Sequence, residues 1–286
     1  MYTLRHLDES LPEIIDRVAS SGFEGVEFAG VIPDTEATAV RDRLDATGTV
    51  PVGAHVDLRT LESLSETAME SIHTVGVDRL IIPHISIDHF RTRARLANLV
   101  ERISELSETL SRSGLTLALH TDRMIMLPFL GKPGYLRLNR FDGLPTGAYN
   151  HLSWVASRSV PRTGATLREQ TPLGYIATHV EGLGLEIDIK SIAQSGYAYE
   201  TVFETFEEDC SLVHVSDVTQ TRRIPPAYQP VDIGEGMVNT TLALDALERY
   251  PVDWLVAEHD NPDDPIASLD RCAAAVSASH APVPPL

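Results

Sequence analysis

The sequence predicts an α/β protein that folds as a single closed (β/α)8 barrel, the TIM-barrel architecture. Short apolar runs alternate with segments of helical periodicity, and this alternation favours parallel strands connected by helices. The runs are apolar throughout, as expected for strands that are covered on both faces. A length of 286 residues suits one such barrel, which typically needs ~250 residues. We therefore expect residues 1–286 to form one domain.

Seven strands are evident from the apolar runs. They are expected at residues 25–29, 50–55, 78–83, 115–120, 183–188, 211–216 and 253–258. Residues 1–4 are expected to supply an eighth strand, the first in the chain, truncated by the start of the sequence. Helices are expected at 11–20, 35–46, 61–75, 91–113, 199–208, 240–250 and 266–280. An open doubly wound sheet is the alternative, but no G-x-G-x-x-G turn follows the first strand.

Two stretches interrupt the alternation of strands and helices. Strand five ends at His120 and strand six at Asp188, and the 67 residues between these two positions are about twice what a helix and two loops need. Because residues 128–165 are rich in glycine and proline, we expect a long loop or lid at approximately 123–170, on the side where barrel active sites form. A disordered insertion is the alternative. The stretch 219–235 is also expected to be irregular.

The composition excludes several classes of protein. The chain has 41 acidic and 23 basic residues, a formal charge of −18, which disfavours nucleic-acid and anionic-membrane partners. We interpret the charge as adaptation to a salt-rich cytoplasm, and an acidic face without a ligand is the alternative. No apolar run is long enough for a membrane span, and the first residues lack the apolar segment of a secretory signal. Two cysteines, Cys210 and Cys272, are too few for a disulfide framework. A reduced, cytoplasmic enzyme is expected.

Charged and imidazole side chains follow the predicted strands at their carboxyl ends. They are Arg5, Glu27, His55, His84, His120, Asp122, Asp188, His214, Asp217, Glu258 and His259. A closed barrel brings these strand ends to one rim. Carboxylates and imidazoles crowded there are unfavourable unless a cation compensates them. Mixed Asp, Glu and His ligation suits one divalent ion, Mn²⁺, Co²⁺, Zn²⁺ or Mg²⁺, and the absence of thiolates argues against structural zinc.

Structural roles are open for each of these residues. Asp188 is either a metal ligand or the N-cap of the following helix. His214, three residues before Asp217, is either a ligand or catalytic residue or a hydrogen-bonded core histidine. Glu258 is interpreted as a ligand or an acid/base group, because an unpaired buried glutamate is costly. Glu27 either reaches the site or pairs with an arginine such as Arg5.

Several short fragments are distinctive by their order and spacing along the chain. They lie at residues 2–5, 22–28, 115–120, 184–188, 213–217, 233–236 and 254–262. They include His214-x-x-Asp217, Gly234-Glu235-Gly236 and Glu258-x-Asp260. In order and spacing, these fragments resemble the xylose isomerase-like TIM barrels, specifically the sugar phosphate isomerase/epimerase family, over residues 2 to about 280.

The resemblance implies a divalent metal held by Asp188, His214 and Glu258. Relatives place a fourth ligand, a glutamate, near the end of strand five, where this chain has His120-Thr121-Asp122. His120 or Asp122 is therefore expected to substitute for it. Relatives also often have a histidine three residues after the strand-six aspartate, where this chain has Ser191, next to Lys190.

The activity implied by the resemblance is metal-dependent isomerisation or epimerisation of a sugar, sugar phosphate or polyol through an enediolate. Glu258 is expected as one acid/base group, with His120 or Asp122 as the other. The residues expected to bind substrate are Arg5, Glu27, His55, His84 and Asp217. A dehydratase of a cyclic polyol or keto-acid, and a sugar-binding barrel without catalysis, remain alternatives. An abasic-site endonuclease is disfavoured by the negative charge, and formation of a homo-oligomer stays open.

Overall fold

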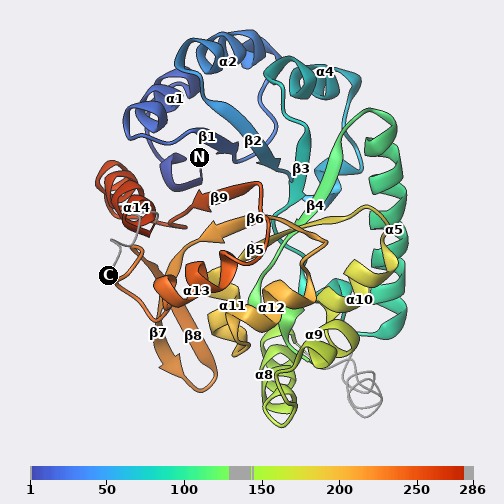
Figure 1. Ribbon diagram of the computed structural model, residues 1–286. Helices are drawn as coiled ribbons and strands as arrows, with labels where there is room; N and C mark the ends of the chain where they lie inside the picture. Colours follow the sequence, from blue (N-terminus) through green and yellow to red (C-terminus); the bar gives the residue numbers. More distant parts are fainter. Residues whose placement is uncertain (1, 129–142, 144, 280–286) are drawn as a thin grey trace.

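Seven parallel strands form the central sheet of the computed structural model, in the order β1-β2-β3-β4-β5-β6-β9 (Figure 1). The structure describes residues 2–128, 143 and 145–279. The strands of this sheet are β1 (Gly25–Phe28), β2 (Val50–His55), β3 (Arg79–Ile82), β4 (Thr116–His120), β5 (Gly184–Asp188), β6 (Cys210–Val215) and β9 (Trp254–Ala257). All six strand pairings within the sheet are parallel, which confirms the predicted α/β architecture.

The first and last strands of the sheet, β1 and β9, lie next to each other, so the sheet curls into a nearly closed barrel (Figure 1). Gly25 in β1 makes this approach possible. A Cβ atom at Gly25 would lie 2.6 Å from Cγ2 of Val52 and 3.0 Å from the Trp254 ring. A larger residue at position 25 would therefore push β1 away from both neighbouring strands.

The eighth strand expected at residues 1–4 is not formed at residues 2–4, the part of this segment that the structure describes. Tyr2–Leu4 is instead a short 3-10 helix, η1. Thr3 and Leu4 are buried, and the Thr3 hydroxyl accepts a hydrogen bond of 3.0 Å from the backbone N–H of His259, just after β9. The apolar residues suggested a strand, but Leu4 is buried here without strand pairing, and Tyr2 is 38% exposed.

Helices surround the barrel on its outer side (Figure 1). They are α1 (Leu11–Ser20), α2 (Asp34–Thr47), α3 (Leu58–Leu61), α4 (Glu66–Val75), η2 (Ile87–His89), α5 (Arg93–Arg112), α6 (Arg123–Met126), α8 (Thr146–Ser157), α9 (Gly164–Gln170), α10 (Pro172–His179), α11 (Ile189–Ser195), α12 (Tyr199–Thr205), α13 (Thr240–Leu247) and α14 (Pro265–Ser279). No described helix has the length and apolar character that a bilayer span requires.

The two stretches expected to be irregular contain regular structure. The described part of the insertion at 123–170 includes α6, α8 and α9, so it is not a simple loop; residues 129–142 and 144 lie outside the described chain. The stretch 219–235 forms most of an antiparallel hairpin of β7 (Asp217–Arg223) and β8 (Pro226–Val231). Pro225-Pro226 and Gly234-Glu235-Gly236 suggested irregular structure, but a strand in a two-stranded ribbon tolerates proline on its open edge.

Two layers of side chains fill the inside of the barrel. The layer nearer the amino ends of the strands is apolar and contains Val52, Ile81, Ala118 and Leu212, with Trp254 and Val256 packed against them. Side chains alternate between the two faces of a strand, so the next inward positions after Leu212 and Ala118 are His214 and His120. The barrel interior therefore changes from apolar to ionisable toward the carboxyl ends of the strands.

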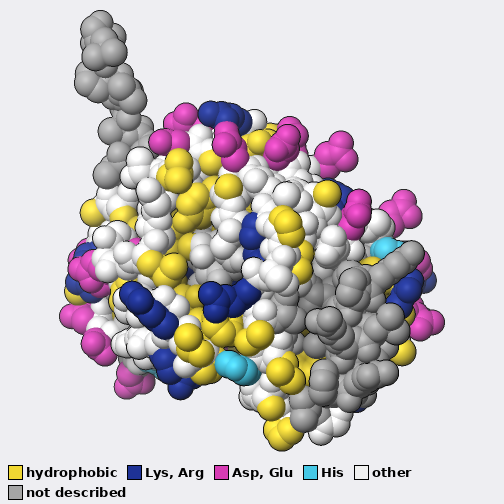
Figure 2. Space-filling model, turned by 90° about the horizontal axis from the view of Figure 1, so that it is seen from below, with side chains coloured by type: hydrophobic (Ala, Val, Ile, Leu, Met, Phe, Trp, Pro, Cys, Tyr) yellow, Lys and Arg dark blue, Asp and Glu magenta, His cyan; other side chains and the backbone are white. Residues whose placement is uncertain are grey.

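The acidic character of the protein is not spread evenly over its surface. Figure 2 shows the molecule from below, on the side of α8 and the β7–β8 hairpin, with arginine or lysine and apolar side chains near the middle and acidic side chains mainly around the outline. The formal charge of −18 therefore does not describe every face equally.

Candidate metal centre

The candidate site is built around His214, which is fully buried at the carboxyl end of β6. Each of its ring nitrogens points to carboxylates from other strands. Nδ1 lies 3.1 Å from Oε2 of Glu258, while Nε2 lies 3.0 Å from Oε1 of Glu186 and 3.2 Å from Oε2 of Glu27. One imidazole thus joins two groups of side chains at different depths in the barrel.

The outer group consists of His120, Asp188, His214 and Glu258. Each of the four offers one ligand atom, and these atoms lie within 4.8 Å of one another. His120 and Asp188 end β4 and β5, His214 is the last residue but one of β6, and Glu258 directly follows β9. Asp188 and His214 are fully buried, and His120 and Glu258 are 9% and 6% exposed. The structure therefore brings together the three predicted metal ligands, and it places His120 beside them.

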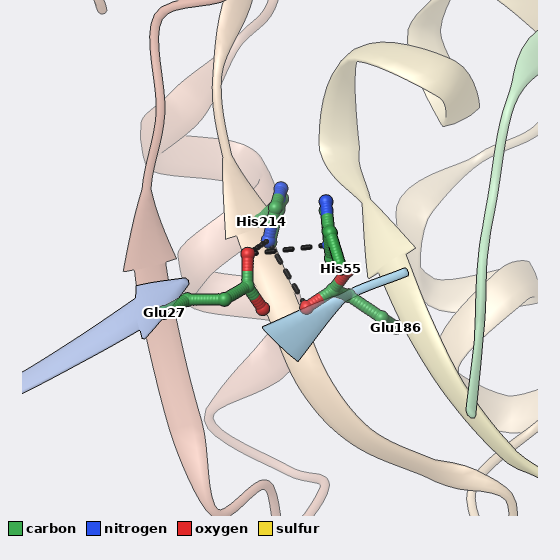
Figure 3. A group of neighbouring side chains, drawn as sticks. All are labelled: Glu27, His55, Glu186 and His214. Atoms are coloured by element: carbon green, nitrogen blue, oxygen red, sulfur yellow. Dashed lines mark hydrogen bonds and ion pairs between the residues drawn. The ribbon is translucent and has the colours of Figure 1, made fainter. Parts of the chain in front are cut away.

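The inner group consists of Glu27, His55, Glu186 and His214, whose possible ligand atoms also lie within 4.8 Å of one another (Figure 3). Nε2 of His55 lies 2.6 Å from Oε2 of Glu186 and 3.2 Å from Oε2 of Glu27. The rings of His55 and His214 are stacked with their centroids 5.5 Å apart. In this group each imidazole contacts both carboxylates.

The two buried glutamates of the inner group have opposite pKa shifts. For Glu27, burial raises the pKa, and the nearby charge of Glu186 adds to this effect. For Glu186, burial also opposes ionisation, but His214 and His55 outweigh it and hold the pKa of Glu186 well below its usual range. The inner group therefore favours one carboxylate that is ionised and one that holds its proton more readily.

Lys190 places an ammonium group at the edge of the outer group. Its Nζ lies 2.7 Å from Oδ2 of Asp260, 3.0 Å from Oδ2 of Asp188 and 3.6 Å from Oε2 of Glu258. Burial opposes ionisation of Asp188, but Lys190 and His120 outweigh it and lower the pKa of Asp188 to about 2. Burial likewise disfavours the ammonium form of Lys190, but the three carboxylates outweigh it and raise the pKa of Lys190.

The outer group is suited to a divalent cation by its donor atoms. It offers two imidazoles and two carboxylates, a mixture that Zn²⁺, Mn²⁺ and Co²⁺ accept. Neither ring nitrogen of His120 has a hydrogen-bond partner among the described residues, although both are buried. Oδ2 of Asp188 lies 3.5 Å from Nε2 of His120. A buried imidazole without hydrogen bonds is costly, and coordination of a cation would satisfy it.

A cavity of about 340 Å³ opens directly on the outer group. It is lined by Tyr2, Ala29, His55, Pro83, His84, His120, Glu258 and Asp260. Tyr2 belongs to η1, and the other lining residues lie at or just beyond the carboxyl ends of five strands. The cavity therefore occupies the end of the barrel where the loops that follow the strands can shape a binding site.

Three residues expected at the site, Asp122, His84 and Arg5, have other contacts or lie beside it. Oδ1 of Asp122 accepts hydrogen bonds from the backbone N–H groups of Met124 and Ile125, and its Oδ2 lies 2.9 Å from Nδ1 of His84. His84 lines the cavity, with its side chain 65% exposed. The Arg5 guanidinium stacks 3.7 Å from the centroid of the Tyr2 ring. Asp122 and Arg5 do not line the cavity.

Asp217, also expected to bind substrate, holds the segment that follows the β7–β8 hairpin. Its Oδ1 accepts hydrogen bonds from the backbone N–H groups of Val218 and Val238, at 2.7 and 3.0 Å. Its Oδ2 accepts from those of Gly234 and Gly236, at 3.1 and 2.9 Å. Both carboxylate oxygens thus accept hydrogen bonds from the backbone, and Asp217 is only 2% exposed.

Sequence reasoning missed three residues of this region: Glu186, Lys190 and Asp260. Glu186 lies within an otherwise apolar strand, but it stands two positions before Asp188 and so faces the same side of β5. Lys190 and Asp260 are 70 positions apart in the sequence. Their contact depends on where the segments after β5 and β9 lie at the barrel rim, which no sequence pattern shows.

Solved structures share the fold of this chain, although no family model and no curated protein matches its sequence. A sugar phosphate isomerase/epimerase from Parabacteroides distasonis is 13% identical, with a TM-score of 0.69 over 98% of this chain and 92% of that chain. The probable 3-DHS dehydratase AsbF from Bacillus anthracis is 13% identical, with a TM-score of 0.66 over 96% of each chain.

A third structure, an IolI protein with a bound zinc atom, is 13% identical, with a TM-score of 0.66 over 97% of this chain and 95% of that chain. At such identities a structural match establishes the fold and leaves the activity open. The chain therefore has the xylose isomerase-like TIM-barrel fold, which sugar phosphate isomerase/epimerase structures and xylose isomerase domain proteins share.

Proposed function

We propose that this protein is a divalent-metal-dependent isomerase or epimerase that acts on a small sugar with a carbonyl group. The observation that supports this proposal best is the outer group of His120, Asp188, His214 and Glu258, whose donor atoms converge within 4.8 Å beside a cavity of about 340 Å³. Structures of the same fold include a sugar phosphate isomerase/epimerase and a zinc-bound IolI protein.

In this proposal, the metal is held by Asp188, His214 and Glu258, with His120 as the fourth ligand. Zn²⁺, Mn²⁺, Co²⁺ and Mg²⁺ are the candidates, and the two imidazoles favour the first three over Mg²⁺. When bound, the metal would act as a Lewis acid that stabilises negative charge on the substrate oxygens.

The chain's own residues supply the proton transfers. Burial opposes ionisation of Glu258, but the adjacent His214 and Lys190 outweigh it and hold the pKa of Glu258 well below its usual range. Its carboxylate is thus ionised at neutral pH and able to accept the proton from the carbon next to the substrate carbonyl. Proton removal leaves an enediolate, and return of the proton to the neighbouring carbon or to the opposite face gives the isomer or the epimer.

His120 is better placed than Asp122 to be the fourth ligand, a role that leaves Glu258 as the acid/base group. It lines the cavity, whereas both carboxylate oxygens of Asp122 have partners. His55 and His84 also line the cavity, and we assign them to hydroxyl recognition.

We further propose that the enzyme acts in the cytoplasm, in keeping with its two buried free cysteines, and that it does not bind nucleic acid.

Dehydration is the second candidate activity, because the probable 3-DHS dehydratase AsbF matches this chain over the same length. Both reactions begin with removal of a proton next to a carbonyl, but dehydration then expels a neighbouring hydroxyl group. A panel of keto-sugars, polyols and cyclic keto-acids, assayed in ²H₂O with each metal at high KCl, separates the two.

Deuterium at the carbon next to the carbonyl, seen by NMR without loss of water, supports the isomerase or epimerase. A new conjugated double bond, seen by ultraviolet absorbance, supports the dehydratase. If no substrate exchanges hydrogen with any metal, the protein is a binding barrel and the proposed activity is wrong.

A further inference from the structure

Lys190 occupies an unusual position for a lysine in this protein. The sequence contains only two lysines against 21 arginines. The Lys190 side chain is only 12% exposed, yet its ammonium group contacts three carboxylates. A buried ammonium group is stable only when nearby negative charges compensate the loss of hydration. These carboxylates are therefore part of what keeps Lys190 in place.

Two of the three carboxylate oxygens that contact Lys190 belong to the proposed metal ligands. Oδ1 of Asp188 already accepts hydrogen bonds from the backbone N–H of Lys190 and from the hydroxyl of Ser216, at 2.9 and 2.5 Å. Only Oδ2 of Asp188 therefore faces the site, and it is this oxygen that lies 3.0 Å from Nζ of Lys190. The Glu258 oxygen that faces Lys190, Oε2, is likewise the one beside His214.

Because the same carboxylate oxygens face both Lys190 and the metal site, we propose that the Lys190 ammonium group competes with the divalent metal for Asp188 and Glu258. Asp260 is its alternative partner, since the shortest contact of the ammonium group is with Oδ2 of Asp260, on the outer side of the site. When metal binds, Lys190 keeps Asp260 and gives up its share of the two ligand carboxylates. The inference rests on the proposed function, because it takes the outer group as the metal site.

Two consequences follow from the competition. Metal affinity is lower than the four ligands alone would give, because a positive charge a few ångströms away repels a divalent ion strongly in a buried site. The metal-free protein is also stable, because Lys190 already compensates the buried carboxylates. Removing Lys190 should reverse both effects at once, which a purely structural lysine would not do.

The first experiment measures Mn²⁺ binding by calorimetry in the metal-free wild type and in Lys190→Met. The variant should bind Mn²⁺ at least about tenfold more tightly, because the competing charge is gone. Arg79→Met is the matched control. It also removes one positive charge, which pairs with Asp253 at 3.0 Å, but Arg79 lies at the amino end of β3, away from the site. The control should stay within about threefold of the wild type.

The second measurement is thermal unfolding with and without saturating Mn²⁺. Metal-free Lys190→Met should unfold at a lower temperature than the wild type, and Mn²⁺ should raise its unfolding temperature more than it raises that of the wild type. If Lys190→Met does not fold without metal, Lys190→Arg tests the same idea, because it keeps the cation and should keep the weaker binding of the wild type.

Asp260→Asn provides a test in the opposite direction. Without Asp260, Lys190 has only Asp188 and Glu258 as partners, so Mn²⁺ binding should weaken, and it should weaken less when Lys190→Met is also present. Equal Mn²⁺ affinities in the wild type and Lys190→Met would overturn the competition and leave the proposed function standing. Absence of Mn²⁺ binding in both proteins would overturn the metal site itself, and the competition with it.

Discussion

His214 and Glu258 come from neighbouring strands, and Nδ1 of the imidazole lies 3.1 Å from Oε2 of the carboxylate. The strands β6 and β9 pair with His214 opposite Val256, which sets Glu258 two residues further along, at the same rim. One short parallel pairing thus joins a proposed metal ligand to the proposed base. The same carboxylate also faces the cavity.

Glu258→Gln should therefore abolish most of the activity. The substitution keeps the size of the side chain but removes the negative charge that accepts the proton, so kcat should fall at least ~100-fold. Glu108→Gln, which makes the same change on the exposed face of α5, is the control and should leave kcat unchanged. Activity of Glu258→Gln within about tenfold of the wild type would show that Glu258 is not the acid/base group.

The opposite pKa shifts of Glu27 and Glu186 predict unequal costs for the same substitution. Because Glu186 is ionised between His55 and His214, Glu186→Gln leaves those two rings without their charged partner and should lower the free energy of unfolding by roughly 3–5 kcal/mol. Burial and the charge of Glu186 raise the pKa of Glu27, so the ionised form of Glu27 is less favoured than that of Glu186, and Glu27→Gln should cost less, about 1 kcal/mol. Urea unfolding at pH 7 without metal compares the two, and a larger loss for Glu27→Gln would contradict the assignment.

The main elements of the barrel could be predicted because burial on both faces leaves a continuous apolar signal. The expected strand at 211–216 is β6 (Cys210–Val215), and the expected helix at 91–113 is α5 (Arg93–Arg112). The convergence of Asp188, His214 and Glu258 could be predicted for a related reason. Polar residues that follow apolar strands in a closed parallel barrel lie on one rim whatever their separation in the chain.

The remaining parts depend on contacts that leave no periodic signal. The 3-10 helix η1 resembles a short strand in sequence, and its hydrogen bond with the backbone of His259, just after β9, leaves no sequence signal. The β7–β8 hairpin is stabilised largely by pairing with itself and shows no alternation of apolar residues. Glu186 could have been found from its spacing to Asp188, whereas the contact of Lys190 with Asp260 could not.

Potassium chloride should stabilise this protein. A formal charge of −18 on 286 residues produces repulsion between acidic side chains, and molar salt reduces the screening length to about 3 Å. The unfolding temperature, measured by calorimetry, should therefore rise as KCl is increased from 0.1 to about 2 M. NaCl at the same ionic strength should act similarly if screening is the cause. A temperature that falls with KCl would contradict salt adaptation.

Asp217 should matter for stability rather than for substrate affinity. Its carboxylate accepts four backbone N–H groups, and a Cβ atom on Gly236 would lie only 2.2 Å from its Oδ1. The segment after the hairpin is thus built closely around this side chain. Asp217→Asn replaces one accepting oxygen with a donor and removes the charge, which should lower the free energy of unfolding by about 3 kcal/mol.

Asp45→Asn, on the exposed face of α2 with its side chain 66% exposed, is the matched control and should change stability by less than about 0.5 kcal/mol. Urea unfolding and steady-state kinetics on the same preparations separate the two possible roles of Asp217. If the carboxylate only organises the backbone, Asp217→Asn unfolds at lower urea while KM of the folded enzyme changes little. A substrate contact would instead raise KM and leave the unfolding midpoint near that of the wild type, because the four backbone hydrogen bonds would then contribute little to stability.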